Sequence, residues 1–459
     1  MYQIDFNTPV AVHFIGIGGI SMSGLAEILL ERGFSVSGSD ARDSELTQHL
    51  AAMGARIAIG QCAENICDGI DVVVYTAAIR PDNPEYQAVI AKGIPMLTRA
   101  ELLGQLMKNY PLPIAVAGTH GKTTTTSMVA TVFLADEADP TITVGGILPT
   151  IGSNIRTGKG DAFIAEACEY TNSFLSFFPK MALILNVDED HLDFFKNIHD
   201  IADSFHRFAA LLPKDGTLII NRDTREFEAV TADLDCEVIT YALENESANY
   251  TATSVSATDD GGSTFTCLEN GQPLMEVRLH VPGLHNVSNA LGVIACARRA
   301  GIATDVIAKG LAAFAGTKRR FEKKGVMKGV TIIDDYAHHP TEIKATLASA
   351  ATYPHRELYV AFQPHTYTRT NALLKDFAEA LKDADHVLLA DIYAAREKNT
   401  IGITSDALRV ALEEKGCDAV YLPTFDDIEN YILTHCVDGD LLITMGAGDI
   451  VEVGENLLS

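Results

Sequence analysis

The sequence predicts an α/β fold with three domains built on parallel sheets. Short apolar runs typical of buried strands alternate with amphipathic segments along nearly the whole chain, and this alternation indicates parallel sheets covered by helices. The chain has 459 residues, and at about 150 residues per domain this length favours roughly three domains. The predicted strands are 11–17, 71–77, 113–118, 161–167, 181–187, 216–220, 329–334, 357–362, 386–391 and 440–448.

Two segments mark the expected domain boundaries. Prolines in NYPLP at 109–113 separate a helical segment from a new strand, and GTKRRFEKKG at 316–325 is basic and contains glycine. The predicted domains are therefore 1–110, 111–317 and 318–459. Within the second domain, residues 250–282 have the turns and short runs of antiparallel strands.

Composition excludes several classes of function. The net charge of −26 would repel nucleic acid and anionic membranes. No apolar run approaches the ~20 residues of a membrane span, and the N-terminus lacks the pattern of a signal peptide. The eight cysteines form no CxxC pair and read as reduced thiols. We expect a cytoplasmic protein without a nucleic-acid partner or membrane insertion. Composition favours no oligomeric state.

A glycine-rich loop follows the first strand. Gly16 and Gly18 match the first two positions of a GxGxxG diphosphate-binding turn, Gly19 is an additional glycine, and Ser21 replaces the third. The loop leads into a helix whose N-terminal N–H groups favour phosphate. The same loop also occurs as a simple strand-to-helix turn. Asp40 ends the next strand, where it either holds a ribose hydroxyl or only ends the strand.

The strongest single motif is a phosphate-binding loop between strand 113–118 and a helix. It departs from the usual GxxxxGK[ST], because Val116 stands at the first glycine position. The physical parts remain, since glycines free the backbone, Lys122 reaches the outer phosphates and the Thr123 hydroxyl can bind Mg²⁺. The expected phosphate contacts are Gly118, Thr119, His120, Gly121, Lys122, Thr123 and Thr124.

Acidic residues follow two central strands. Glu166 ends one strand and the run 188–191, with sequence DEDH, follows another. Ligands bind at this edge of parallel sheets. Mg²⁺ prefers oxygen ligands, so Glu166 suits it best. By itself the DEDH run, with His191 at its end, reads more readily as the start of a helix, where acids are favoured.

Polar residues in the last third of the chain have two interpretations each. Asn286 and Asn289 either cap a helix or face a purine. Arg320 is basic enough to pair with phosphate or is ordinary surface. Asp335 and the adjacent histidines at 338 and 339 lie between a strand and a helix begun by a proline. The histidine pair suggests zinc, but no third ligand stands at typical spacing.

Taken together these motifs identify a family. HFIGIGGISMSGLA, AGTHGKTTTTS, NVDEDHLDFF, VPGLHNVSNAL, RRFE, DDYAHHPTEIKAT and FQPHTYTRT occur in order along almost the whole chain. In this the chain resembles the Mur ligases. The resemblance implies an N-terminal Rossmann-like sheet, a central P-loop ATPase-like domain with added antiparallel strands, and a C-terminal Rossmann-like domain. It also implies ATP and Mg²⁺ as cofactors.

The resemblance is strongest to members that join L-alanine to the lactyl carboxylate of UDP-N-acetylmuramate, through an acyl phosphate, in peptidoglycan synthesis. The alternative is a related ligase that adds a peptide to the same substrate. The implied UDP-sugar contacts are Gly16, Gly18, Gly19, Ser21 and Asp40. The implied metal ligands are Thr123, Glu166 and His191. The implied ATP contacts outside the loop are Asn286, Asn289, Arg320 and Asp335, the substrate contacts are His338 and Arg369, and the catalytic residues are Lys122, Arg320, Asp335 and His338.

The chain departs from the family pattern at two places. It has EACEYT where the family often has EADESD, which puts Cys168 and Tyr170 near the predicted metal ligands, and Thr366 replaces a frequent arginine. Two other classes compete with a ligase. An NAD-dependent oxidoreductase would explain the glycine loop alone, but not Lys122. A non-catalytic nucleotide-binding regulator would need none of Lys122, Glu166 and Asp335.

Overall fold

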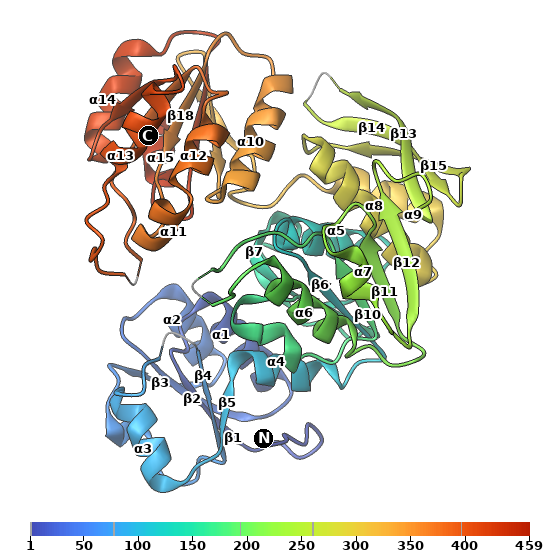
Figure 1. Ribbon diagram of the computed structural model, residues 1–459. Helices are drawn as coiled ribbons and strands as arrows, with labels where there is room; N and C mark the ends of the chain where they lie inside the picture. Colours follow the sequence, from blue (N-terminus) through green and yellow to red (C-terminus); the bar gives the residue numbers. More distant parts are fainter. Residues whose placement is uncertain (1, 77–78, 193, 259–260, 396) are drawn as a thin grey trace. The chain divides into compact units, whose positions relative to one another are not determined.

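The computed structural model describes residues 2–76, 79–192, 194–258, 261–395 and 397–459. The chain divides into two compact units, residues 1–251 with 292–310 and residues 252–291 with 311–459. The described residues form three sheets with helices between their strands, which confirms the predicted α/β class (Figure 1). Among the described residues, no helix is long and apolar enough to cross a membrane.

The N-terminal sheet has the strand order β3-β2-β1-β4-β5, with every pairing parallel. Successive residues of β1 point to opposite faces, so Phe14 joins one buried cluster and Ile15 the other. The strands are β1 (Ala11–Ile15), β2 (Ser35–Asp40), β3 (Arg56–Ile59), β4 (Val72–Tyr75) and β5 (Met96–Thr98). The helices are α1 (Ile20–Glu31), α2 (Glu45–Ala52), α3 (Pro84–Lys92) and α4 (Arg99–Met107), with a 3₁₀ turn η1 (Ala63–Asn65).

The central sheet is mixed, with the order β15-β14-β13-β12-β11-β10-β6-β9-β7-β8. From β12 to β7 the pairs are parallel, whereas β7–β8 and β14–β15 are antiparallel. The parallel part consists of β6 (Leu112–Ala117), β7 (Thr141–Leu148), β9 (Ala162–Glu166), β10 (Met181–Ile184), β11 (Thr217–Asn221) and β12 (Glu237–Ala242). The remaining strands are β8 (Ser153–Arg156), β13 (Tyr250–Ala257), β14 (Ser263–Glu269) and β15 (Gln272–Leu279).

The helices of this central region follow its strands along the chain. They are α5 (Lys122–Ala135), α6 (Ile198–Ala209), α7 (Phe227–Thr231), α8 (Leu284–Arg299) and α9 (Thr304–Ala313), with 3₁₀ turns η2 (Pro149–Ile151) and η3 (Tyr170–Ser176). Helix α5 begins where β6 and its loop end, so the predicted phosphate-binding loop lies at the carboxyl edge of the parallel strands. This is the edge at which open parallel sheets bind ligands.

The C-terminal sheet has the order β16-β17-β21-β18-β19-β20, in which only the β16–β17 pair is antiparallel. Ile332 and Ile333 of β17 belong to different buried clusters, so both faces of the sheet are covered. The strands are β16 (Glu322–Met327), β17 (Val330–Asp335), β18 (Leu358–Phe362), β19 (His386–Leu389), β20 (Asp418–Tyr421) and β21 (Leu441–Met445). The helices are α10 (Pro340–Thr352), α11 (Tyr367–Ala372), α12 (Leu374–Leu381), α13 (Ser405–Glu413), α14 (Phe425–His435) and α15 (Val451–Leu458).

All ten predicted strand runs coincide with strands of the structure, although several strands are shorter than the run. Residue 77, the end of one run, lies outside the described residues, as do residues 259–260 of the segment expected to be antiparallel. That segment contains the antiparallel β14–β15 pair. The first residues of β13 do not fit the expected antiparallel pairing, because Tyr250 and Thr251 pair in parallel with β12.

Candidate active site

The glycine loop between β1 and α1 is held by the end of β2. The N–H groups of Gly16 and Ile17 both donate to the carbonyl of Ser39, at 2.9 Å. The next residue, Asp40, accepts the N–H of Gly18 on Oδ2 at 2.8 Å. Asp40 therefore shapes the loop itself, which neither sequence interpretation of this residue had anticipated.

Close packing explains why glycine occupies position 18. A Cβ there would lie 2.9 Å from Asp40 Oδ2 and 3.0 Å from a carbon of Thr47. Helix α1 then begins at Gly19 without a side-chain cap and without an acid in its first turn. Such a helix start favours an anion. Ser21 accepts a hydrogen bond from the guanidinium of Arg99 at 3.0 Å.

The phosphate-binding loop joins β6 to α5 and depends on left-handed backbone at two glycines. Gly118 has φ +147° and Gly121 has φ +81°, conformations that other residues rarely adopt. Gly121 is the N-cap of α5, and the first turn of this helix contains no acid. Thr124 lies in that turn. The loop thus presents a helix start suited to phosphate.

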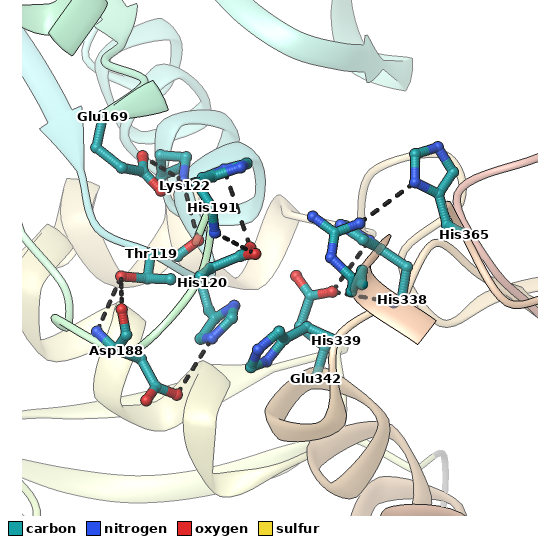
Figure 2. Close-up of polar contacts among 12 residues, drawn as sticks. Thr119, His120, Lys122, Glu169, Asp188, His191, His338, His339, Glu342 and His365 are labelled. Carbon is teal, nitrogen blue, oxygen red and sulfur yellow. Dashed lines mark hydrogen bonds and ion pairs between the residues drawn. The ribbon is translucent and has the colours of Figure 1, made fainter. Parts of the chain in front are cut away.

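Lys122 is tied back onto its own loop and onto a buried acid. Its Nζ donates to the carbonyls of Gly118 and Thr119, at 2.5 and 2.9 Å, and to both carboxylate oxygens of Glu169, at 3.1 and 2.8 Å (Figure 2). Burial disfavours the charged lysine, but Glu169 outweighs this effect, and the pKa of Lys122 is raised. Lys122 is therefore a fixed cation at the start of α5.

The other end of the loop is joined to the segment after β10. The side chain of Asn186 accepts the His120 N–H at 2.8 Å and donates to the His120 carbonyl at 3.0 Å. The N–H of Asp188 donates to Thr119 Oγ1 at 3.0 Å, and the Asp188 carboxylate lies 3.4 Å from His120 Nε2 (Figure 2). Asn186 and Asp188 thus brace the loop rather than start a helix.

Thr123 and Glu166 form the oxygen pair expected for a magnesium ion. Thr123 Oγ1 donates to Glu166 Oε2 at 2.9 Å, and the N–H of Gly145 in β7 donates to the same oxygen at 2.7 Å. A hydroxyl and a carboxylate are ligands that Mg²⁺ accepts. The residues present therefore fit the predicted metal.

His191 lies beside Glu169 rather than being bonded to Glu166. Its Nε2 is 3.9 Å from Glu169 Oε1 and 3.9 Å from Asp190 Oδ2. Its ring packs against Tyr170, with centroids 4.5 Å apart. The backbone of His191 has φ +53°, a conformation that is uncommon outside glycine. The EACEYT departure thus supplies a ring that packs on the predicted metal ligand.

Cys168 precedes Glu169 in the chain, and its thiol is held in the protonated form. Burial, and then the neighbouring charge of Glu169, raise its pKa to about 11. A thiol attacks as the thiolate. The raised pKa keeps Cys168 protonated at neutral pH, in agreement with the absence of a nucleophile motif in the sequence.

In the second unit, the two adjacent arginines have separate tasks. Arg319 donates to Asp334 at 3.0 Å and to the carbonyls of Gly446 and Gly448, at 2.9 and 3.0 Å, and so ties the loop after β21 to β17. Arg320 lies 3.9 Å from Glu342 Oε1, and its guanidinium stands 5.2 Å from the ring centroid of Tyr336. Arg319 is thus bonded to β17 and to the loop after β21, whereas Arg320 contacts Glu342 and Tyr336.

Asp335 ends β17 and is buried. Its two oxygens accept the N–H groups of Phe321 and Ala337, at 2.8 and 2.7 Å. Burial raises the pKa of Asp335 to about 6, although the charge of Arg320 and the two backbone bonds act in the opposite direction. This carboxylate has an unusual pKa near an arginine, a combination common at functional sites.

Glu342 connects the predicted substrate residue His338 to Arg320. Its Oε2 accepts the His338 N–H at 3.1 Å and lies 3.2 Å from His338 Nδ1 (Figure 2). The His338 and His365 rings lie 5.8 Å apart, and Arg369 donates to His365 Nδ1 at 3.3 Å. The second unit therefore brings the predicted residues Arg320, His338 and Arg369 into one chain of contacts.

His339 and the two asparagines have structural partners within the same unit. His339 is the N-cap of α10 and accepts the Thr341 N–H. The Asn286 side chain donates to the Pro282 carbonyl at 2.7 Å, and Asn289 donates to Asn286 Oδ1 at 3.3 Å. Both asparagines are buried. Their amide groups retain further donor and acceptor capacity.

Sequence reasoning missed Glu169, Glu342 and Asn186 as site residues. Glu169 lies inside the EACEYT segment, between Cys168 and Tyr170, which are departures from the family pattern. Glu342 stands four residues after His338 on a helix start, and this i,i+4 spacing could have identified it. Asn186 lies near the end of the predicted strand 181–187, two residues before the first acid of the DEDH run.

Three family models match consecutive parts of the chain. They are described as the Mur ligase family catalytic domain at 11–111, the Mur ligase middle domain at 116–297 and the Mur ligase glutamate ligase domain at 319–448. Similar chains are the UDP-N-acetylmuramate–L-alanine ligases of Lachnospira eligens, 58% identical, and Agathobacter rectalis, 56% identical, each over 100% of both chains.

Solved structures match over the whole chain as well. A UDP-N-acetylmuramate–alanine ligase of Thermotoga maritima has a TM-score of 0.81 at 29% identity, and a murein peptide ligase of Psychrobacter arcticus has 0.72 at 26%. Both comparisons cover 98% of each chain. The likeness to these structures over 98% of the chain confirms the predicted fold class.

Proposed function

The chain belongs to the Mur ligase family, and from this premise we propose that it joins L-alanine to the lactyl carboxylate of UDP-N-acetylmuramate while ATP is converted to ADP and phosphate. The observation that carries the proposal is the β6–α5 loop, in which Lys122 stands as a fixed cation at a helix start. The full-length relatives named for this reaction support the choice of substrates. The reaction belongs to peptidoglycan precursor synthesis in the cytoplasm.

A carboxylate does not react readily with an amine, because oxide is a poor leaving group. Phosphorylation of the carboxylate by ATP gives an acyl phosphate, and phosphate then leaves when the amine attacks. Lys122 and Arg320 neutralise charge that spreads over the transferring phosphoryl group. His338 and Arg369 contact the substrates, Asp335 contacts ATP, and the UDP-sugar contributes binding energy remote from the reacting atoms.

A magnesium ion completes this arrangement. When bound, Mg²⁺ supplies positive charge next to the outer phosphates of ATP. Thr123 and Glu166 would hold it, since their oxygens lie 2.9 Å apart at the start of α5. His191 is the third proposed ligand. Its ring packs against Tyr170, which limits the orientations that the imidazole can take.

The domains have separate tasks in this proposal. Residues 1–110 bind the UDP-sugar through Gly16, Gly18, Gly19 and Ser21, with Asp40 shaping the loop. Residues 111–317 bind ATP through the 118–124 loop, Asn286 and Asn289. Residues 318–459 contribute Arg320, Asp335, His338 and Arg369.

A panel of acceptors tests the function. ADP release is measured with ATP, Mg²⁺ and UDP-N-acetylmuramate while L-alanine, glycine, L-serine or an alanyl-glutamyl-diaminopimelate tripeptide is supplied. We expect turnover with L-alanine to exceed that with the tripeptide by a large factor. Turnover with the tripeptide alone would replace the proposal by the peptide-adding alternative. Amino-acid-independent ADP release, or none, would contradict both.

The metal assignment has its own test. Equilibrium binding of Mn²⁺, a paramagnetic substitute for Mg²⁺, is followed by electron paramagnetic resonance in the presence of ADP. Glu166→Gln and His191→Gln should each weaken Mn²⁺ binding, whereas Glu189→Gln, an exposed acid of the same DEDH run, should not. Unchanged Mn²⁺ binding by the His191 variant would leave Thr123 and Glu166 as the protein ligands.

A further inference from the structure

The proposed UDP-sugar site contains few obvious cationic groups that could balance the negative charge of a diphosphate. The chain has a net charge of −26, and the glycine loop itself offers only neutral N–H donors. Several of these are already used, because the Gly16 and Ile17 N–H groups donate to the Ser39 carbonyl and the Gly18 N–H donates to Asp40. A diphosphate bound there needs a cation that the sequence motif does not provide.

Arg99 brings a cation to the start of α1. It is the first residue of α4, directly after β5, and its Nη1 donates to Ser21 Oγ at 3.0 Å. Ser21 is the second residue of α1, so the guanidinium lies beside the N-terminal turn of that helix. This turn has no acid and no side-chain cap. The positive end of a helix dipole and a guanidinium thus meet at one place.

The position of Arg99 is fixed by its own helix. Thr98 and Glu101 form a capping box, in which the Thr98 N–H donates to Glu101 at 2.7 Å and the Glu101 N–H donates to Thr98 at 3.2 Å. The nearest acid in the sequence is therefore engaged with the backbone. Arg99 is half-buried, and its backbone cannot move without disturbing this cap.

The guanidinium of Arg99 also lacks an anionic partner within the part of the chain that the structure describes: no carboxylate oxygen lies within 4.0 Å of it. Several other arginines of this acidic chain are paired with carboxylates. Arg319 contacts Asp334 and Arg356 contacts Asp440. An arginine that donates only to a hydroxyl retains most of its five N–H donors.

We propose that Arg99 binds the diphosphate of the UDP-sugar. The planar guanidinium forms two parallel hydrogen bonds to phosphate oxygens, and Ser21 holds one edge of the group in place. The first turn of α1 supplies neutral N–H donors to the same phosphates. The assignment rests on the proposed function, since it names a further contact of the site that the glycine loop identifies.

Calorimetric titration of the full chain with UDP, UMP and UDP-N-acetylmuramate tests the assignment. Arg99→Met should weaken UDP and UDP-sugar binding by about 10- to 100-fold, the range expected for charge-assisted hydrogen bonds. The loss should be smaller for UMP, which carries one phosphate, and Arg99→Lys should recover part of the affinity. ATP binding and Tm should stay unchanged, which shows that the variant is folded.

Arg32→Met is the matched control. Arg32 lies at the opposite end of α1, where its guanidinium donates to the Tyr110 hydroxyl at 2.8 Å. The same change of charge there should leave UDP binding within twofold. Equal UDP affinity in Arg99→Met and the unaltered chain would overturn the assignment and leave the proposed function standing. Absence of UDP-sugar binding by the unaltered chain would overturn the proposed function, and the assignment with it.

Discussion

At the scale of single residues, Lys122 has the most constrained environment of the proposed phosphate site. Two carbonyls of its own loop and both oxygens of the buried Glu169 accept its protons. An ion pair of this kind lowers the cost of keeping a charge away from water. The ammonium is thereby held charged beside the N-terminus of α5.

Lys122→Ala should lower kcat/KM for ATP by about 10²- to 10³-fold, the usual effect of removing one donor to a developing charge. The substitution also leaves Glu169 buried without its cation, so a loss of stability should accompany the loss of activity. Stopped ADP-release assays and calorimetric binding of UDP-N-acetylmuramate measure the two effects. UDP-sugar affinity should be unchanged, and near-normal ATP turnover would contradict the role of Lys122.

Asp335 provides a titration that can be followed directly. Its pKa of about 6 lies above the ordinary 3.8, and burial is the largest cause of this shift. Arg320 lowers this pKa and Glu342 raises it. Carboxyl carbon NMR should therefore find a higher pKa in Arg320→Met and a lower one in Glu342→Gln. A pKa near 3.8 in the unaltered chain would contradict this description of the site.

The same shift has a consequence for stability. Because the folded state holds the proton more tightly than the unfolded chain, the stabilisation is fully present below pH 3.8 and is lost as pH rises through about 6. The free energy of unfolding should thus fall by a few kcal/mol over this interval, about 1.4 for each pKa unit. In Asp335→Asn this contribution should disappear, while the rest of the pH profile remains.

Residues that belong to a motif with fixed spacing were recognisable from the sequence. The glycines, Lys122 and Thr123 of the phosphate-binding loop are recognisable because each has one physical task at fixed spacing. Glu169 and Arg99 were not predicted, because the function of an acid or an arginine depends on the group beside it, which the sequence does not show. Their partners, Lys122 and Ser21, are 47 and 78 residues away in the chain.

At the scale of elements, the glycine loop depends on buried polar residues of β2 and α3. The Ser39 carbonyl receives two N–H groups of the loop, and the Ser39 hydroxyl donates to Glu85 at 2.6 Å. Asn65 donates to the other Glu85 oxygen at 2.5 Å. Burial disfavours the Glu85 carboxylate, but hydrogen bonds involving His13, Ser39 and Asn65 leave its pKa below the ordinary value.

Glu85→Ala should lower the free energy of unfolding by about 1–3 kcal/mol, because it leaves the buried Ser39 hydroxyl without its acceptor. It should also raise KM for the UDP-sugar with little change in KM for ATP, since Ser39 holds the loop. Glu45→Ala, an exposed acid in the first turn of α2, is the control. Equal effects on both substrates would indicate general destabilisation rather than an effect on the glycine loop.

Elements buried on both faces were the ones that sequence predicted. Strands β6, β10, β18 and β21 are continuous apolar runs, and the run alone identifies them. Sequence reasoning missed strands such as β3, β8 and β20, whose residues are mostly half-buried or exposed. These strands lie at sheet edges, where one side lacks a partner and the apolar pattern weakens.

At the scale of the whole molecule, the proposed chemistry uses groups from both compact units. Lys122 and Glu166 belong to the first unit, whereas Arg320, Asp335 and His338 belong to the second. The order of motifs along the chain placed Lys122 in the predicted domain 111–317 and Arg320 in the predicted domain 318–459, and the roles of these residues stay a prediction. Only the structure shows the partners within each group, because hydrogen bonds such as that from the His338 N–H to Glu342 leave no trace in composition.

The central claim is that ATP phosphorylates the substrate carboxylate before the amine attacks. The most direct test uses UDP-N-acetylmuramate labelled with heavy oxygen in the lactyl carboxylate, together with ATP, Mg²⁺ and L-alanine, and mass spectrometry of the phosphate released. An acyl phosphate requires one carboxylate oxygen to leave with that phosphate, so labelled inorganic phosphate should appear in proportion to product. Unlabelled phosphate with full product formation, or label in AMP with release of pyrophosphate, would contradict the claim.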